Sequence, residues 1–519
     1  MADVSQIKVK GTKYDIKDEE ARRFIQELQD RPSGGASAYL TITTTTESFK
    51  GKTVTLSKGG TTIDTATFDT SGSCNFSVME TGDYVLSCEG FTTKVTVSEF
   101  YQTYAITLNS IIVYAFHING NESDPAAMVT YPAGSENENF TPAYMDYSSG
   151  TFNYGSWGNA FFIPKPCMLK SDGTVDYYLN ENDYTKKENG TASDIANTSY
   201  DGNAMMEWGQ NGTKIWYKVV LDSGSTKSAT VYIASYQADE DYVAYSFINS
   251  KNEYIDHFYT PIYNGSLISN KLRSLSGQSI MNTQTVTDEV TYAKANNTDS
   301  DVEWYTEVIA DRILINFLLV LMGKSLNTQA VFGEGYTTGG SSTTLTALKT
   351  GSMNTKGMFW GSNDGSETTG VKVFGMENWW GTQWRRIAGL IYYPATGTMY
   401  GKMTYGTADG STATSYNENG SGYIVLDTKA VNSSGYASEM LFNKYGMFPA
   451  AWSIAGSATT YYCDYTGRGY ASSSDVYGYA YVGCDCNGES ICGAFCCLLS
   501  HAASHSSWAV GAALSCKPV

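Results

Sequence analysis

Residues able to bind a metal or act as nucleophiles gather between Tyr461 and Val519, a stretch that holds seven of the ten cysteines and two of the four histidines. His501 and His505 have the H-x3-H spacing of a zinc-binding pair, and neighbouring thiolates would complete a ligand set. The cysteines of the stretch are Cys463, Cys484, Cys486, Cys492, Cys496, Cys497 and Cys516. Zinc modules usually supply C-x2-C knuckles within a short polar unit, and the sequence contains none. The spacing therefore does not favour a metal site, and we expect none.

The side chains of this stretch alternate in a way that a packed helix or strand does not explain. Small residues such as Gly493, Ala502 and Gly511 are interleaved with chemically unrelated ones such as Ile491 and His501. A core element would keep a steady apolar period. The pattern indicates a fixed scaffold that carries interchangeable side chains.

The ending GAFCCLLSHAASHSSWAVGAALS, residues 493–515, resembles the variable region of the target proteins of diversity-generating retroelements. In that family, template-guided mutagenesis of adenines rewrites chosen codons, very often asparagine codons. The fixed pattern reads GAF-x-x-x-L-x-x-A-A-S-x-S-x-W-x-I-G-A-x-L-S, and this chain matches it with Val510 in place of Ile. Tryptophan, lysine and glutamate cannot be reached from an asparagine codon by changing adenines, and Trp508, Lys517 and Glu489 occur where fixed positions are expected.

The resemblance implies a hypervariable segment at about 461–515 whose side chains contact a ligand. The ligand-binding residues it implies are Tyr477, Tyr479, Tyr481, Cys484, Asp485, Cys486, Ile491, Leu498, Ser500, His501, His505, Ser507 and Ala509. A catalytic nucleophile is not expected inside a segment that is continually rewritten. We therefore predict no catalytic residue and no enzyme activity.

Two earlier blocks, Lys165–Tyr184 and Gly375–Arg386, are similar to those of phage tail proteins with C-type-lectin folds of the formylglycine-generating-enzyme subclass. The EPN, QPD and WND signatures of calcium-dependent sugar binding are absent, and the acid-rich turns at 119–124 and 238–241 do not fit an EF-hand. Neither CNGESIC nor CGAFC reproduces the paired-cysteine copper site of formylglycine-generating enzymes. We expect no cofactor.

Two other features indicate packing rather than chemistry. Three closely spaced tryptophans followed by two arginines are more typical of a core with stacked guanidinium groups than of a binding patch; they are Trp379, Trp380, Trp384, Arg385 and Arg386. The apolar run Ile313–Met322 is too short to span a bilayer. The pattern predicts one long helix over Asp301–Met322, capped by Gly323, with this run buried.

The elements divide the chain into three parts and predict an α+β fold that is rich in β-structure. Residues 1–35 read as a hairpin around Gly11-Thr12, a short amphipathic helix and a linker. Similar N-termini in phage tail proteins imply an attachment segment, and a solvated N-terminal tail is the alternative. Residues 36–109 contain about seven short alternating runs, which predict an immunoglobulin-like β-sandwich. Residues 110–519 read as one large α+β region, and the resemblance implies that it is a C-type-lectin-like domain with large insertions.

Composition excludes several classes of function. A net charge of −18 argues against binding nucleic acid or anionic membranes. No Gly-rich phosphate loop follows a plausible strand. No secretory signal is visible, so we expect synthesis in the cytoplasm and do not assume disulfides. Cys74 and Cys88, on adjacent candidate strands, are expected to be two small buried residues.

The resemblance implies a receptor-binding protein at the tail tip of a bacterial virus, located in the virion. Its partners would be a receptor on the bacterial host surface, protein or glycan, and other tail proteins bound through the N-terminus. The family implies a homotrimer, and we expect no membrane insertion. One alternative is a structural tail or baseplate protein without a receptor role. Another is a polysaccharide-degrading enzyme, since paired carboxylates cannot be found from spacing alone.

Overall fold

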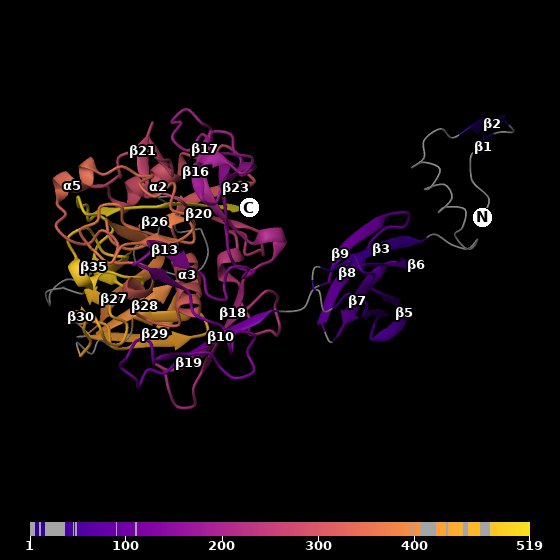
Figure 1. The fold of residues 1–519 in the computed structure, drawn as a ribbon, viewed down its shortest axis with the longest axis horizontal. Coiled ribbons are helices and arrows are strands. Elements are labelled where there is room, and N and C mark those ends of the chain that lie inside the picture. Colours follow the sequence, from indigo (N-terminus) through magenta and orange to yellow (C-terminus); the bar gives the residue numbers. More distant parts are fainter. Residues whose placement is uncertain are drawn as a thin grey trace. The chain divides into compact units, whose positions relative to one another are not determined.

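The computed structural model describes residues 6–9, 12–15, 37–44, 46, 49–89, 91–108, 112–395, 398–404, 422–431, 434–449, 455–467 and 478–519. The chain divides into two compact units, Met1–Ile111 and Ile112–Val519, at a boundary next to the one expected between residues 109 and 110. Figure 1 draws both units, and each is described by itself. The predicted helix at about 18–30 and the linker at 31–35 lie outside the described residues.

The first unit contains a hairpin and a β-sandwich. Strand β1 (Gln6–Val9) pairs antiparallel with β2 (Thr12–Asp15), as the alternation predicts. All seven alternating runs are strands: β3 (Ala38–Thr43), β4 (Thr53–Lys58), β5 (Thr61–Thr67), β6 (Ser73–Val78), β7 (Gly82–Cys88), β8 (Phe91–Val97) and β9 (Thr103–Thr107). They form two sheets with the orders β6-β3-β9 and β5-β4-β7-β8. Apolar side chains of both sheets, such as Leu40 and Leu86, share one core.

Cys74 and Cys88 are free and buried in the core of this sandwich. As expected, they lie on consecutive strands, β6 and β7, and these strands belong to different sheets of the sandwich. The two thiols act as small apolar residues.

The second unit is β-rich and is built around two large sheets. The seven-stranded sheet has, in order, β16 (Asp183–Lys187), β15 (Val175–Asn180), β14 (Lys165–Lys170), β17 (Gly202–Trp208), β20 (Phe258–Pro261), β37 (Leu514–Pro518) and β23 (Val302–Thr306). The other sheet has, in order, β29 (Ile424–Val431), β28 (Thr398–Met403), β27 (Trp384–Ala395), β34 (Gly478–Val482), β35 (Cys497–His501), β33 (Tyr465–Gly467) and β30 (Gly435–Tyr436), with β36 (Val510–Gly511) parallel to β27.

Smaller elements complete this unit. A four-stranded sheet has the order β11 (Val129–Thr130), β10 (Val113–Ile118), β19 (Ala229–Ala234) and β18 (Trp216–Leu221), and a three-stranded one contains β24 (Trp360–Gly361), β25 (Val371–Val373) and β26 (Met376–Glu377). Three hairpins pair β12 (Tyr144–Asp146) with β13 (Thr151–Asn153), β21 (Ser266–Ile268) with β22 (Lys271–Arg273), and β31 (Met440–Asn443) with β32 (Gly446–Pro449). The α-helices of the described residues are α2 (Val286–Lys294), α3 (Ile309–Gly323), α4 (Thr328–Phe332) and α5 (Ser342–Ala347), and the short 3₁₀ turns are η2 (Gln210–Gly212), η3 (Tyr245–Phe247) and η4 (Glu489–Ile491).

The single long helix predicted over Asp301–Met322 is wrong at its N-terminal end. Residues 302–306 (VEWYT) form strand β23, because β-branched and aromatic residues there pair with β37 over five residues. Helix α3 begins only at Ile309. Gly323 is its last residue, and Lys324, with φ of 50°, is the left-handed C-cap.

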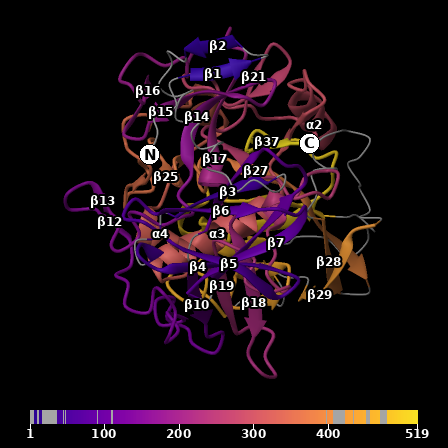
Figure 2. The same ribbon diagram turned by 90° about the vertical axis from the view of Figure 1, so that its right-hand side faces the viewer.

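The predicted burial of the apolar run is confirmed, since all fifteen residues of α3 are buried. Both views place this helix in the interior of its unit (Figure 1 and Figure 2). Its polar residues are therefore paired. Asn316 accepts a hydrogen bond from Nε1 of Trp379 at 2.9 Å, and Arg312 donates to the Trp379 carbonyl at 2.8 Å and stacks on its indole ring at 3.9 Å. The buried charges are retained because each finds a partner.

Strand β37 lies inside the seven-stranded sheet, between β20 and β23. Its Lys517 is fully buried, with Nζ 3.8 Å from Asp311 of α3 and donating to the Ile248 carbonyl at 3.2 Å. Burial raises the pKa of Asp311 to about 6, although Lys517 opposes the rise. The residues that follow the candidate variable segment are thus part of the core.

Among the described residues, no helix is both long enough and apolar enough to cross a membrane.

Candidate functional site

The candidate site is the C-terminal segment, residues 478–513, which runs along strand β27. It contains β34, a loop at 483–496 with the turn η4, strand β35, a loop at 502–509 and the short strand β36. β34 lies between β27 and β35, and β36 pairs with β27 in parallel. The segment is therefore held in the middle of a sheet rather than at its edge.

The structure divides the predicted contact residues into two groups. Half-buried side chains, which retain surface, are Asp485, Ile491, Leu498, His501, His505 and Ser507. Buried side chains are Tyr479, Tyr481, Cys484, Cys486, Ser500 and Ala509. Tyr477 lies outside the described residues.

For the six buried residues, the expectation of an exposed contact side chain is wrong in this structure. All five residues of β34 are buried, so successive side chains of this strand do not alternate between core and solvent, and Tyr479 and Tyr481 are both covered. They pack with Ile391 and Val510. Both faces of this strand are covered by other parts of the unit, which removes the outward face that an exposed residue requires.

Other residues of the segment carry more surface than the predicted ones. The exposed side chains of the segment are Asn487, Glu489, Ser490, Ser504 and Ser506. Ser504 was expected to be framework, and its neighbours Ala502 and Ala503 are half-buried. Gly493, Ala494, Phe495 and Leu514 are buried, as framework positions should be. No sequence signal separates the exposed serines from the buried Ser500.

A hydrogen-bonded cluster lies under the two histidines. Their rings stack at 3.8 Å between centroids, and the Tyr481 hydroxyl lies 3.0 Å from Nδ1 of His505. Arg386 donates to that hydroxyl at 2.9 Å and, through Nε, to Glu289 of α2 at 2.7 Å. Because the hydroxyl accepts from Arg386, its own proton is available for Nδ1 of His505, which is then an acceptor on a neutral ring.

The surroundings keep both imidazoles neutral. Burial, with His505 and Arg386 close by, lowers the pKa of His501 to about 4, and burial and Arg386 also lower the pKa of His505. Burial raises the pKa of Glu289 to about 7, against the opposing effect of Arg386. Glu289 and Arg386 are separated by 97 residues in sequence, so sequence spacing gave no sign of this pair.

We predict that His501 makes the protein less stable as the pH falls. The unfolded chain binds a proton near pH 6.5, whereas the folded chain binds it only near pH 4, so protons favour unfolding across that window. Denaturant unfolding of wild type and His501→Asn between pH 7.5 and pH 4.5 checks this. As the pH falls, the wild type should lose more unfolding free energy than the variant. A pH-independent difference would contradict the prediction.

Three thiols form a second cluster beneath the loop at 485–491. Cys484, Cys492 and Cys496 are buried against one another, and Ile491 and the half-buried Trp384 pack on them. Burial opposes ionisation of Cys484, but hydrogen bonds from the other two thiols outweigh it and lower its pKa. For Cys492 and Cys496, burial and the bond to Cys484 raise the pKa.

We predict that Gly488→Ala destabilises this loop. A methyl group on Gly488 would collide with the sulfur atoms of both Cys484 and Cys492, which are buried. Overpacking of this kind costs about 1–3 kcal/mol. Gly158→Ala is the matched control, since its new methyl would meet only Cβ of Tyr154 at 3.9 Å. Chemical denaturation should show a lower free energy of unfolding for Gly488→Ala and no loss for Gly158→Ala. Equal stabilities of the two variants would disprove the clash.

Trp384 separates from the other two tryptophans of its group. Trp379 and Trp380 are fully buried, as predicted for a core. Trp384 is half-buried and packs on both the thiol cluster and the apolar cluster that contains Tyr481. Although Trp384 lies outside the segment 461–515, it contacts two separate parts of it.

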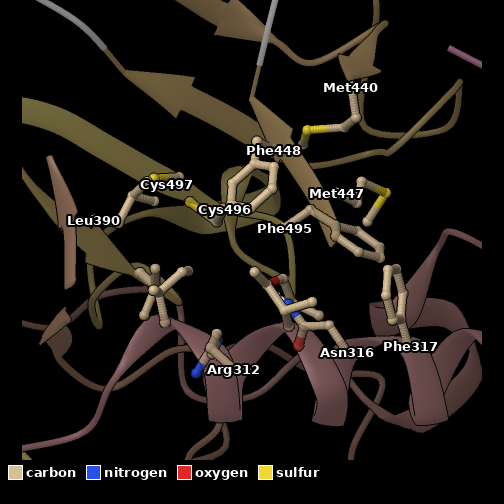
Figure 3. Close-up of a pocket in the computed structure, with 14 residues that line it drawn as sticks. Arg312, Asn316, Phe317, Leu390, Met440, Met447, Phe448, Phe495, Cys496 and Cys497 are labelled. Atoms are coloured by element: carbon tan, nitrogen blue, oxygen red, sulfur yellow. Dashed lines mark hydrogen bonds between the residues drawn. The ribbon is translucent and has the colours of Figure 1, made fainter. Parts of the chain in front are cut away.

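A small cavity lies between α3 and the segment. Figure 3 shows Arg312, Asn316 and Phe317 of α3 facing Phe495, Cys496 and Cys497 across it. Its volume of about 50 Å³ is well below the ~300 Å³ at which ligand pockets begin. The cavity is a packing defect under the site rather than a binding pocket.

A wider hollow of about 640 Å³ borders β18, lined by Lys218, Glu240 and Asp241 among others. None of the predicted site residues lines it. Lys218 is already paired with Asp239 and Asp241 at 2.9 and 3.0 Å, so the hollow presents no unpaired charge from this residue.

Over the described residues, no group of three or more His, Cys, Asp and Glu side chains is arranged to hold a metal ion. The two histidine rings lie within 16° of parallel, and Nδ1 of His505 is occupied by Tyr481. Stacked rings direct their lone pairs side by side rather than toward one ion. All ten cysteines are free.

Comparisons with known proteins give no assignment. No family model matches the chain, and no curated protein matches it. Among solved structures, the full-length major pilin SpaD from Corynebacterium diphtheriae is similar over 54% of this chain and 75% of its own length, at 10% identity and a TM-score of 0.12. A likeness at that score carries no argument about fold or function.

Proposed function

We propose that the chain is a receptor-binding adhesin of a phage tail tip, diversified by a retroelement, whose C-terminal segment contacts the bacterial host surface. The unit 112–519 would be a C-type-lectin-like domain of the formylglycine-generating-enzyme subclass. The ligand would be a protein or glycan receptor, and binding rather than catalysis would be the activity.

The observation that supports this most is how the segment is held. Residues outside it bind its main-chain atoms: Asn316 donates to the Ala494 carbonyl at 2.8 Å, and Asp464 accepts from the Phe495 amide at 2.7 Å. The carbonyls of Ala503, His505, Ser507 and Ala509 accept from Val286, Arg386, Thr283 and Trp384 at 2.9–3.1 Å. Main-chain bonds do not depend on which side chain is present. Such a backbone tolerates substitution of its exposed side chains, which changes stability by about 0.5 kcal/mol or less.

Burial narrows the proposed contact surface. It consists of the half-buried predicted residues together with the exposed positions between them: Asp485, Asn487, Glu489, Ser490, Ile491, Leu498, His501, Ser504, His505, Ser506 and Ser507. We add Trp384, whose half-buried indole would be a constant aromatic anchor beside exchangeable neighbours.

The remaining parts would attach and space this surface. The sandwich 37–108 has seven strands in sheets of three and four, and it would be a spacer. Residues 1–35 would dock on other tail proteins, and a homotrimer would multiply weak contacts by avidity. The protein would be located in the virion.

Sequencing this gene across a viral population tests the proposal directly. We expect substitutions to concentrate at the surface positions that the resemblance leaves variable, which are Asp485, Ile491, Leu498, His501, His505 and Ser507. We also expect a near-copy of the coding segment that differs only at adenines, beside a reverse transcriptase gene. Substitutions spread evenly over 112–513 would refute diversification.

Binding to host cells tests the receptor role. The combined variant Leu498→Asn, His501→Asn, His505→Asn and Ser507→Asn should remain folded and lose at least about tenfold in affinity. Replacing the exposed Ile63, Met79 and Tyr101 of the sandwich is the control and should change nothing. Equal binding by the combined variant would favour a structural tail protein, and release of sugars from host envelope would identify an enzyme instead.

A further inference from the structure

The thiol cluster brings together cysteines from both ends of one surface loop. Cys484 lies just after β34 and Cys492 just after η4, so the two flank the loop 485–491. Each is at most 1% exposed. Among the described residues of this loop, Asn487, Glu489 and Ser490 are exposed, while its inner side rests on the sulfur atoms.

The two sulfur atoms are close enough to touch a single methyl group. A methyl on Gly488 would strike both, and Cys484 and Cys492 share a hydrogen bond. Sγ of Cys492 also donates to the Asp485 carbonyl at 3.6 Å, which holds it beneath the loop. By contrast, Cys486 turns away, and its sulfur lies against Gly340. A disulfide forms between sulfur atoms that can reach each other, and both of these lie within 2.8 Å of the place a methyl group on Gly488 would take.

We propose that Cys484 and Cys492 are a site of oxidative cross-linking that closes the loop 485–491 into a covalent ring. The oxidant is a low-molecular-weight disulfide. The Cys484 thiolate attacks one of its sulfurs, forming a mixed disulfide and releasing one thiolate. Cys492 then loses its proton and attacks the Cys484 sulfur, which releases the second thiolate. The two protein thiols are oxidised to one disulfide, and the reagent is reduced to two thiols.

The bridge would fix the backbone that displays Asn487, Glu489 and Ser490. A short ring restricts the conformations open to the loop, and a pre-ordered loop loses less entropy when it binds. The thiols stay reduced in a cytosol and oxidise outside it. The inference stands on the sulfur geometry, and only this consequence for binding rests on the proposed function.

Treating the folded, reduced full-length protein with oxidised glutathione, then alkylating it in denaturant, tests the proposal. We expect two of the ten thiols to escape alkylation, and peptide mapping without reductant to join Cys484 to Cys492. Cleavage after the exposed Glu489 by a glutamate-specific protease should become slower, and its products should stay linked until reduced. Ten alkylated thiols, or a bridge between other cysteines, would overturn the proposal.

Matched variants identify the chemistry. Cys484→Ser should abolish the bridge, because Cys484 is the thiol bonded to both others, whereas Cys486→Ser should leave it unchanged. Circular dichroism confirms that each variant is folded, and the wild-type mapping remains decisive if one is not. A stoichiometric metal in the protein as purified, lost on oxidation, would make the cluster a metal site and reject cross-linking as its role.

Discussion

Replacing Arg386 with Met is expected to destabilise the C-terminal unit by about 3–5 kcal/mol, because it leaves a buried carboxylate without its partner. Glu289 is 1% exposed and loses its 2.7 Å bond to Nε. The same change removes the hydrogen bonds from Arg386 to the Tyr481 hydroxyl and the His505 carbonyl. Denaturant unfolding measures the loss, and hydrogen exchange should rise over residues 500–509.

A double variant separates the charge from the packing. With Glu289→Gln added, no carboxylate remains to be buried alone, so the double variant should lose less than the sum of the two single losses. The control is Lys218→Met, which removes a surface ion pair and should cost no more than about 1 kcal/mol. An Arg386 variant as stable as this control would show that the cluster does not hold the loop.

Glu307→Ala is expected to lower the free energy of unfolding by a similar amount, about 3–5 kcal/mol, because it leaves two buried guanidinium groups without this carboxylate. The Glu307 carboxylate lies 3.7 Å from Arg312 and 3.5 Å from Arg385, and all three side chains are at most 2% exposed. The two arginines lie over the same Trp379 ring, at 3.9 and 5.6 Å from its centroid. Without the negative charge between them, they repel each other in a medium of low polarity.

The conservative variant Glu307→Gln tests whether charge is the cause. It keeps the shape and removes the charge. Thermal or denaturant unfolding should therefore show most of the destabilisation that Glu307→Ala causes. Glu240→Ala, at an exposed position, is the control and should stay within about 0.5 kcal/mol of wild type. If Glu307→Gln matched the wild type, the effect would come from packing.

Sequence patterns predicted the helices and strands that depend on residues close together in the chain. The seven strands of the sandwich follow alternation and turn residues, and the buried run of α3 follows its apolar content. The start of α3 was misplaced because β23 is a strand only through pairing with β37, about two hundred residues later. No window of sequence contains both partners.

The exposure of side chains in the candidate segment could not be predicted from the sequence. Side-chain burial in β34 depends on what covers each face, and covering elements come from distant parts of the chain. The pairs Glu289–Arg386, Glu307–Arg385 and Asp311–Lys517 likewise join residues far apart in sequence. Trp384 is half-buried, whereas Trp379 and Trp380 are fully buried, although all three belong to one short motif.

The interior position of β37 affects how the protein is made. Until residues 514–518 leave the ribosome, the strand that lies between β20 and β23 is missing. The five-residue pairing of β23 with β37 can form only after that. A polypeptide terminated anywhere between 478 and 513 lacks this strand and leaves the sheet in two pieces. Nonsense and frameshift products that end in this range should therefore fail to complete the sheet and be recognised as unfolded chains.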